Sequence, residues 1–282
     1  MRKKMRFSIL LTLLLLAAGI AVMSYPFASR WLNQRNQADI INHYEEAVGE
    51  MTKEQIAAEK EASRAYNEGL LGNVVLTDPF DTEAGRKASE EYEERLNTKG
   101  DGVMGYLDIP EINVLLPIYH GTGSEVLDKG AGHLENTSLP VGGIATHAVL
   151  SAHTAYARAT LFNRLTELEE GDAFYLTVLD ETLAYQVDQI KVVEPHDTGA
   201  LVIDGYEDYV TLVTCTPYGV NSHRLLVRGT RIPYEAEEAA IVQEQAKQSC
   251  PLYLIAVVAL LLLLVIFIAV KKKRRRRKKG EA

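Results

Sequence analysis

The sequence predicts a mainly β protein, an antiparallel barrel or sandwich that follows a helical N-terminal region and is enclosed between two membrane-spanning helices. Three observations support this prediction. Uncharged apolar runs cover residues 7–27 and 251–270, and each is near the roughly 20 residues that cross a bilayer as a helix. Residues 36–70 carry apolar positions at mixed spacings of three and four, which is typical of helices. From residue 103 onward, short alternating or apolar runs are separated by Pro, Gly, Asp and Asn, as in an antiparallel β domain.

The charges beside the apolar runs predict their orientation. Four basic residues lie within positions 2–6, and "KKKRRRRKK" (271–279) follows the second run. Both ends are therefore expected in the cytoplasm, with the domain between them outside the cell membrane. A cleaved signal peptide is the alternative for the first run. We favour an uncleaved anchor because the run is long and no clean small-x-small site precedes Tyr25.

The net charge of −8 conceals an acidic middle. Without the basic residues of the two ends and Glu281, 17 Lys and Arg remain against 37 Asp and Glu. Such a domain repels anionic surfaces and stays soluble, and it also suits basic partners such as lysine-bearing proteins. The basic tail directly after an apolar run is typical of an anionic-lipid anchor, so we expect no nucleic-acid partner. The histidines and carboxylates lack compact ligand spacing, so we expect no metal and no other cofactor.

The helical N-terminal region consists of two longer pieces and one short one. Gly49 and Met51 separate the first two pieces, and Thr52 with Gln55 forms a capping box for the second. A loop covers residues 71–85, and "RKASEEYEERLN" is predicted as a further short helix that ends near "KGDG".

The β domain is predicted from five segments that alternate or are apolar throughout. They are "VMGYLDIPEINVLLPIYHG" (103–121), "ATHAVLSAH" (145–153), "AFYLTVLDETLAYQVDQIKVVEPH" (173–196), "YVTLVTC" (209–215) and "SHRLLVRGTRI" (222–232). The stretch "LFNRLTELEEGD" between the second and third is predicted as a single helical insertion.

These elements divide the chain into seven parts. They are a basic cytoplasmic end (1–6), a transmembrane helix (7–27), the helical region (28–102), the β domain (103–233), a juxtamembrane helical linker (234–250), a transmembrane helix (251–270) and a basic cytoplasmic tail (271–282).

The chain has only two cysteines. Cys250 lies at the predicted bilayer edge, whereas Cys215 ends the alternating run in "YVTLVTCTPYG". A disulfide between a bilayer edge and a folded core is implausible. Cys215 is then a lone thiol in an exported domain, which is unusual enough to need an explanation.

A thiol becomes a better nucleophile when a nearby cation lowers its pKa. The turn "TPYGVNSH" after Cys215 is short and leads into "HRLLVRG", so the two strands are expected to form a hairpin that brings Arg224 close to the thiol. Arg228 shares the same strand face by the period of two but lies further from the turn. We therefore rank Arg224 above Arg228 and keep both as candidates.

A catalytic acid or base is the next requirement, and periodicity does not select one. The candidates are His120, His133, His147, His153 and His223. Only His153 ends an apolar run, "AVLSAH", just before a loop, as a residue on a barrel rim would. A surface or buried structural role is the simpler explanation for any lone histidine.

The cysteine segment also resembles a known family. "TLVTCTPYG" followed by "NSHRLLVRG" is similar to the signature of sortases, the membrane-bound cysteine transpeptidases of Gram-positive bacteria. Their pattern is Thr-Leu-x-Thr-Cys with an arginine nine residues on, which here is Arg224. "VLSAHTA" matches the family histidine at His153, although this chain has Ala152 where relatives often carry glycine. The resemblance implies a closed β-barrel with Cys215, His153 and Arg224 as catalytic residues.

Further segments resemble the pilus-assembling class C. "GAGHLENTSLPVGG" (130–143), the two apolar runs and the helical N-terminal region are similar to those enzymes. In "TDPF", Asp78, Pro79 and Phe80 match the class C lid, expected here over residues 76–82. In the family the lid aspartate pairs with the catalytic arginine as a substrate mimic, and the aromatic ring covers the cysteine. The resemblance therefore implies an autoinhibited resting state.

The residues alone allow a simpler explanation of the same segment. Asp78 followed by Pro79 is a good N-cap and first-turn pair for a helix that starts near residue 83.

The resemblance implies a transpeptidase that uses no cofactor. Its substrate is a Leu-Pro-x-Thr-Gly-like (LPXTG) sorting signal, cut between Thr and Gly, and its acceptor is a lysine amine of a pilin subunit. The alternatives are a housekeeping sortase that anchors proteins to peptidoglycan, a hydrolase, or a non-catalytic anchored surface protein. "QEQAKQSCPLY" before the second apolar run holds no sorting signal, so the chain is not expected to be a sortase substrate itself.

Overall fold

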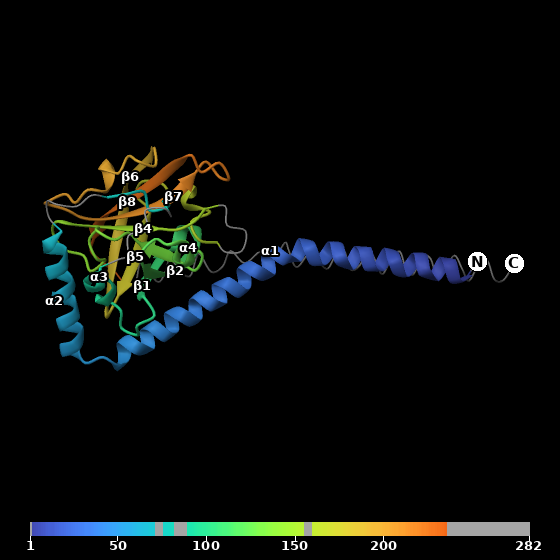
Figure 1. Cartoon of the computed structure of the whole chain (residues 1–282), viewed down its shortest axis with the longest axis horizontal. Coiled ribbons are helices and arrows are strands. Elements are labelled where there is room, and N and C mark those ends of the chain that lie inside the picture. Colours follow the sequence, from blue (N-terminus) through green and yellow to red (C-terminus); the bar gives the residue numbers. More distant parts are fainter. Residues whose placement is uncertain (1, 71–75, 82–88, 155–159, 236–282) are drawn as a thin grey trace. The chain divides into compact units, whose positions relative to one another are not determined.

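The computed structural model describes residues 2–70, 76–81, 89–154 and 160–235 (Figure 1). In this part of the chain, α1 (Arg2–Glu50), α2 (Lys53–Gly69) and α3 (Glu90–Glu94) precede the β domain. The predicted linker from residue 236 onward and the second apolar run fall outside it.

Eight strands of the described chain form the β domain. They are β1 (Val103–Ile109), β2 (Val114–His120), β3 (Ala131–His133), β4 (Thr146–Ser151), β5 (Ala173–Val178), β6 (Glu181–Val193), β7 (Asp208–Thr216) and β8 (His223–Ile232). A short helix, α4 (Ser124–Leu127), lies between β2 and β3.

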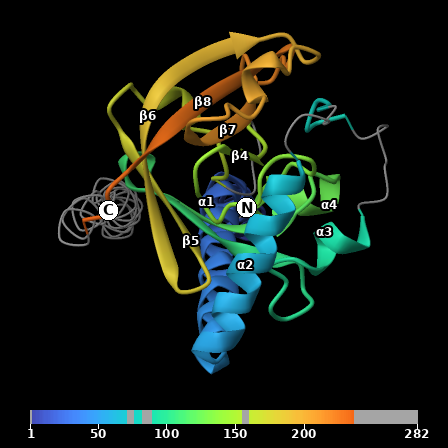
Figure 2. The same ribbon diagram turned by 90° about the vertical axis from the view of Figure 1, so that its left-hand side faces the viewer.

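The strands close into a barrel in the order β1, β2, β3, β4, β7, β8, β6, β5. Figure 2 shows β6, β8 and β7 side by side. The closed barrel is as predicted, but the expectation that it is antiparallel throughout was wrong. β2 runs parallel to β3, and β4 runs parallel to β7. The alternation of apolar residues along a strand is the same in both arrangements, so the sequence pattern did not distinguish them.

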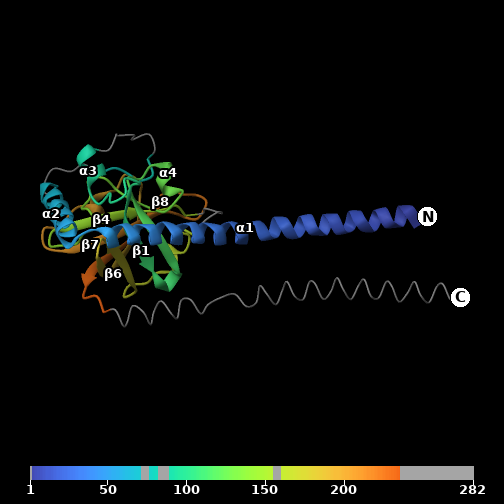
Figure 3. The same cartoon turned by 90° about the horizontal axis from the view of Figure 1, so that it is seen from below.

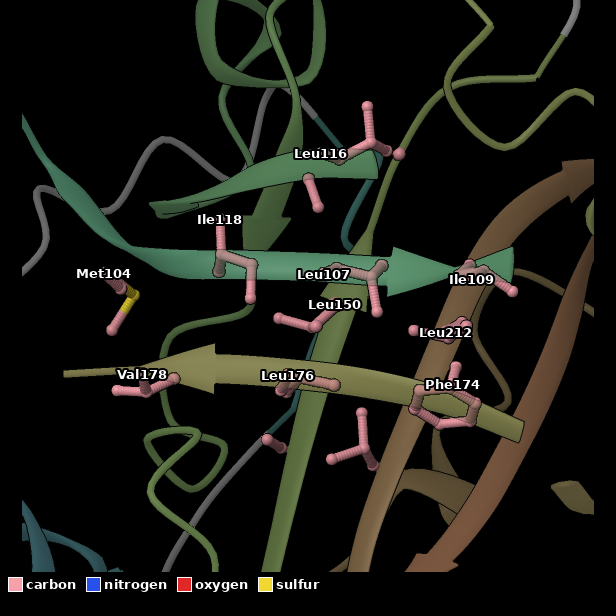
Figure 4. Close-up of a cluster of buried hydrophobic side chains, with 14 of the residues drawn as sticks. Met104, Leu107, Ile109, Leu116, Ile118, Leu150, Phe174, Leu176, Val178 and Leu212 are labelled. Carbon is pink, nitrogen blue, oxygen red and sulfur yellow. The ribbon is translucent and has the colours of Figure 1, made fainter. Parts of the chain in front are cut away.

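Apolar side chains fill the inside of the barrel. Figure 4 labels ten of them, namely Met104, Leu107, Ile109, Leu116, Ile118, Leu150, Phe174, Leu176, Val178 and Leu212. Alternate residues of β7 and β8 point inward, among them Leu212 and Val227, which are fully buried. The residues between them point outward, because successive side chains of a strand face opposite sides. This alternation decides which polar groups of β7 and β8 share the outer face.

The N-terminal helices are fixed to the barrel by buried polar contacts. The Tyr44 hydroxyl on α1 donates to the carbonyl of Met104 at 2.9 Å and accepts from the amide of Leu179 at 2.8 Å. Figure 3 shows α1 passing beside β1, the strand that contains Met104. On α2, the Asn67 amide donates to the Leu139 carbonyl at 3.1 Å and accepts from its N–H at 2.7 Å.

Two predictions for the N-terminal region, the capping box and the further short helix, are confirmed. The capping box of Thr52 and Gln55 starts α2, and α3 lies within the predicted "RKASEEYEERLN" stretch, capped by Ser89. Tyr92 of α3 is fully buried; its hydroxyl accepts from the amide of Gly121 and lies 3.0 Å from His133. These contacts fix α3 against β3 and the residue that follows β2.

The predicted helical insertion at residues 161–172 was wrong. This stretch forms turns and one 3-10 segment, Leu165–Glu167. Leu161 has a positive φ of 35°, which is incompatible with a right-handed helix at this residue. Leu161, Phe162 and Leu165 are all buried in the main core cluster.

Within the described residues, no helix combines the length and the apolar character needed to cross a bilayer. The first apolar run is helical as part of α1.

Candidate active site

Cys215 and Arg224 lie directly opposite each other on the antiparallel strands β7 and β8. The alternate residues Val213 and Leu226 belong to an apolar cluster on the outside of the barrel. The thiol and the guanidinium therefore lie on this same outer face, and each residue is only 9% exposed. The hairpin predicted from the short turn brings the two groups together.

Arg228 lies on the same face but has other partners. Its guanidinium makes two hydrogen bonds to Asp188, at 3.0 and 2.7 Å, and lies 4.1 Å from the centre of the Tyr209 ring. In register it faces Thr211, four residues before Cys215. The structure therefore separates the two candidate arginines, and only Arg224 adjoins the thiol.

His153 comes to the end of β7 because β4 and β7 run parallel. Ser151 lies opposite Val213, and the following residue, Ala152, donates its N–H to the carbonyl of Val213 at 3.2 Å. His153 follows Ser151 by two residues, and Cys215 follows Val213 by two residues. The two parallel segments therefore bring His153 and Cys215 to the same distance along the barrel. The structure thus brings the three predicted catalytic residues to one end of the barrel.

The predicted lid residues cover this group. The Asp78 carboxylate accepts two hydrogen bonds from Arg224, at 2.8 and 2.6 Å. The Phe80 ring centre lies 5.8 Å from that of His153 and 5.1 Å from the Arg224 guanidinium carbon. Pro79 between them is buried. Asp78 also accepts from the N–H of Phe80 at 3.3 Å, and the helix expected near residue 83 lies outside the described residues.

The lid also has an apolar contact with the barrel. Leu76 and Phe80 pack against the outer cluster, which consists of Leu134, Val149, Leu201, Val213 and Leu226. The predicted lid segment therefore contacts both a charged group, Arg224, and the apolar outer cluster.

The electrostatics of this closed arrangement disfavour the thiolate. Burial raises the pKa of the Cys215 thiol, Arg224 lowers it, and Asp78 raises it again. Asp78 thus counteracts the cation that would activate the sulfur. Burial also lowers the pKa of His153, and Asp128, whose carboxylate lies 3.9 Å from Nε2, opposes this shift.

The other candidate histidines have structural surroundings. His133 lies 2.8 Å from the carbonyl of Ser138 and His147 lies 2.7 Å from the hydroxyl of Thr211. Burial lowers the pKa of both to about 4, so both are neutral near pH 7. His120 lies within 3.0 Å of two main-chain carbonyls, and His223 is exposed.

The sequence alone did not reveal Asp128 as a neighbour of the site, and Leu76 was predicted only as part of the lid, residues 76–82. Asp128 ends α4 and reaches His153 only because β3 and β4 are adjacent in the barrel. Its position just before "GAGHL" was a usable signal, because it adjoins the class C segment. Among the described residues, no group of His, Cys, Asp and Glu could form a metal site.

Fold and site together define a cysteine-dependent acyl-transfer protein built on a closed barrel, and comparisons with known proteins agree. A model of the sortase domain matches residues 107–232. The sortase C structure of Streptococcus pneumoniae is 47% identical with a TM-score of 0.65, and the match covers 70% of this chain and 98% of that chain. Sortase C-1 of Actinomyces oris is 45% identical with a TM-score of 0.59, covering 64% and 99%.

Curated sortases are less similar in sequence than these structures. Sortase D of Bacillus subtilis (strain 168) is 34% identical over 131 residues, which is 45% of this chain and 63% of that protein's length. The chain belongs to the sortase family of cysteine transpeptidases, and its similarity over nearly the full length of sortase C structures places it in class C.

Proposed function

We propose that the chain is a pilus-assembling transpeptidase in which Cys215, His153 and Arg224 act on an LPXTG-like sorting signal. The observation that carries the proposal is the Cys215–Arg224 pair, adjacent on neighbouring strands and covered by Asp78. Similar structures include one described as a pilus-related sortase C of Group B Streptococcus, 43% identical over 96% of that chain.

In the first half of the reaction, the Cys215 thiolate attacks the carbonyl carbon of the threonine. The oxyanion that forms requires fixed donors, and Arg224 is the donor proposed here. His153, as imidazolium, gives a proton to the departing glycine amine. The products are a thioester on Cys215 and a free peptide that begins with glycine.

In the second half, a lysine amine of a pilin attacks the thioester. Neutral His153 accepts the proton of the amine, the thiolate leaves, and an isopeptide bond joins the two proteins. The thioester retains the free energy of the cleaved amide, so polymerisation outside the cell needs no nucleotide.

The lid is proposed to keep the enzyme inactive at rest. Asp78 occupies the two guanidinium N–H groups of Arg224 that the oxyanion would use. The Phe80 ring lies beside both His153 and Arg224, and we propose that it also shields the sulfur. Opening of residues 76–81 would expose the sulfur, the imidazole and the guanidinium in one step.

The chain is further proposed to cross the cell membrane twice, with the catalytic domain outside and both ends in the cytoplasm. The apolar runs 7–27 and 251–270 and the basic residues at both ends support this arrangement. Epitope tags at the two termini should be protected from protease in intact protoplasts, whereas residues 103–233 should be digested. Exposure of either tag would contradict the proposal.

The function is tested by trapping a sorting-signal peptide on Cys215 and offering two acceptors together, a pilin lysine and a peptidoglycan stem amine. Release by the pilin lysine supports the proposal. Preferred release by the stem amine would favour the housekeeping alternative, and release by water alone would favour a hydrolase. Pilin joining by a Cys215→Ala variant would refute the assignment.

A further inference from the structure

Ser151 is the last residue of β4, and its side chain is fully buried. Its hydroxyl has no hydrogen-bond partner in the described structure. Buried hydroxyls elsewhere in the barrel do have partners. Ser138 Oγ accepts from the N–H of His147 at 2.9 Å, and Thr214 Oγ1 donates to the carbonyl of Ala152 at 2.8 Å. Among the barrel strands Ser151 is therefore an exception that needs an explanation. The other described buried polar atoms without a partner belong to Ser63, Arg95 and Thr98, which lie outside the strands.

The position of Ser151 relates it to the predicted catalytic residues. It precedes His153 by two residues and lies opposite Val213, which precedes Cys215 by two residues. Val149 on the same strand belongs to the outer cluster, whereas Leu150 belongs to the barrel interior. By alternation, the Ser151 side chain faces outward, on the surface that the lid residues cover.

A buried hydroxyl without a partner destabilises the folded protein, because its hydrogen bonds to water are lost without replacement. An alanine at this position would avoid that loss. Local violations of this kind are expected where a residue serves function rather than stability. The closed lid packs Leu76 and Phe80, both without a side-chain hydrogen-bonding group, on the adjoining outer cluster, so it offers the hydroxyl no partner. A ligand that takes the place of residues 76–81 would supply such a partner.

We propose that Ser151 recognises the substrate: once the lid opens, its hydroxyl donates a hydrogen bond to a main-chain carbonyl of the sorting signal. This inference rests on the function proposed above. Ser151 lies two strand residues, roughly 7 Å, before the level of Cys215. An extended peptide with its threonine carbonyl at the sulfur places its proline carbonyl at this distance. The proline carbonyl of the signal is therefore the assigned acceptor.

The first test compares two buried serines. Ser151→Ala and Ser138→Ala are measured for peptide cleavage and thermal unfolding, both in an Asp78→Ala background so that lid opening does not limit the rate. Ser151→Ala should raise KM roughly 3- to 10-fold, the effect of one net hydrogen bond, with an unchanged or higher Tm. Ser138→Ala should lower Tm, because it leaves the His147 amide unpaired, and should leave KM unchanged.

The second test identifies the acceptor. A peptide in which an alkene replaces the amide after proline lacks the proposed carbonyl. The enzyme that retains Ser151 should bind this peptide more weakly than the unmodified peptide. The Ser151→Ala variant should bind the modified peptide no more weakly than the enzyme with Ser151 does. If the affinity losses from the peptide change and from Ser151→Ala multiply, the serine and this carbonyl act independently. That result would overturn the assignment.

The third measurement does not depend on catalysis. Ser151→Cys is placed in a Cys215→Ala, Cys250→Ser background, with and without Asp78→Ala, and its thiol is labelled with a small reagent. Labelling should be slow with the lid intact and faster after its release. A thiol that stays unreactive in both proteins would overturn the inference.

The outcomes separate the two levels of the proposal. A wild-type chain that forms no acyl-enzyme with any sorting-signal peptide overturns the proposed function. A chain that forms it normally, with the same KM for Ser151→Ala, overturns only the role of Ser151.

Discussion

Arg224 and Asp78 form a two-point ion pair, with hydrogen bonds of 2.8 and 2.6 Å, between residues 146 positions apart in the sequence. Both side chains are largely buried, at 11% and 14% exposure. Charge-assisted pairs of this fork geometry are stronger and more directional than single contacts. Because Cys215 faces the same guanidinium, the proposed lid role implies that the ion pair links the position of residues 76–81 to the reactivity of the thiol.

Removal of the lid carboxylate should activate the thiol. In Asp78→Ala, the pKa of Cys215 should fall, because a group that raises it is lost while Arg224 remains. The sulfur should also become more accessible, so labelling by a small thiol reagent at pH 7 should be faster, roughly tenfold or more.

The matched control for this variant is Asp188→Ala. Asp188 makes an equivalent two-point pair with Arg228 on the same face of β8, so its loss should leave the labelling rate of Cys215 unchanged. Equal labelling of the wild type and Asp78→Ala would rule out the lid role.

The two arginines should respond differently to replacement by lysine. Arg224→Lys keeps the charge but loses the planar fork of donors, so acyl transfer should fall on the order of 10². Arg228→Lys should retain nearly full activity, because Arg228 contacts Asp188 and Tyr209 rather than the thiol. Single-turnover acylation rates measure both variants, and comparable losses would remove the distinction.

Asp128 is expected to maintain the protonated form of His153. Its carboxylate raises the pKa of the imidazole against the larger, opposing effect of burial. In Asp128→Asn the His153 pKa should therefore fall further. With this lower pKa, a smaller fraction of His153 is protonated at neutral pH. Release of the glycine amine, which needs the imidazolium, should therefore slow.

The pKa of His153 in this variant can be followed by NMR titration of its ring protons. Glu125→Gln, on the helix that Asp128 caps, is the control, because Glu125 is not among the groups that shift the His153 pKa. An unchanged His153 titration in Asp128→Asn would show that the 3.9 Å contact has no electrostatic effect.

Asn67 should be important for stability rather than catalysis. It satisfies both main-chain groups of Leu139 in a buried position, so Asn67→Ala leaves two buried groups unpaired. The free energy of unfolding should fall by roughly 2 to 5 kcal/mol. Gln55→Ala, which removes only an exposed capping contact, should cost less than about 1 kcal/mol. Denaturant titrations compare the two variants, and similar losses would contradict this role of Asn67.

Several features of the fold followed from local patterns. The capping box at Thr52, the alternating strands and the hairpin that joins Cys215 to Arg224 involve residues close in sequence. The two parallel strand pairs did not follow, because each joins strands separated by a crossover whose path leaves no mark on the alternation of the strands themselves.

The amino-acid sequence by itself therefore determined the strand faces, the lone thiol and the arginine one turn away, because periodicity and short connections fix such contacts. The family resemblance had already indicated His153 and Asp78. Only the tertiary structure decided which carboxylate adjoins His153 and which hydroxyl of the barrel strands is left unpaired. Asp78, Asp128 and Ser151 meet this site from separate segments. Their meeting depends on how the barrel closes, and closure is a property of long-range packing rather than of any local stretch of chain.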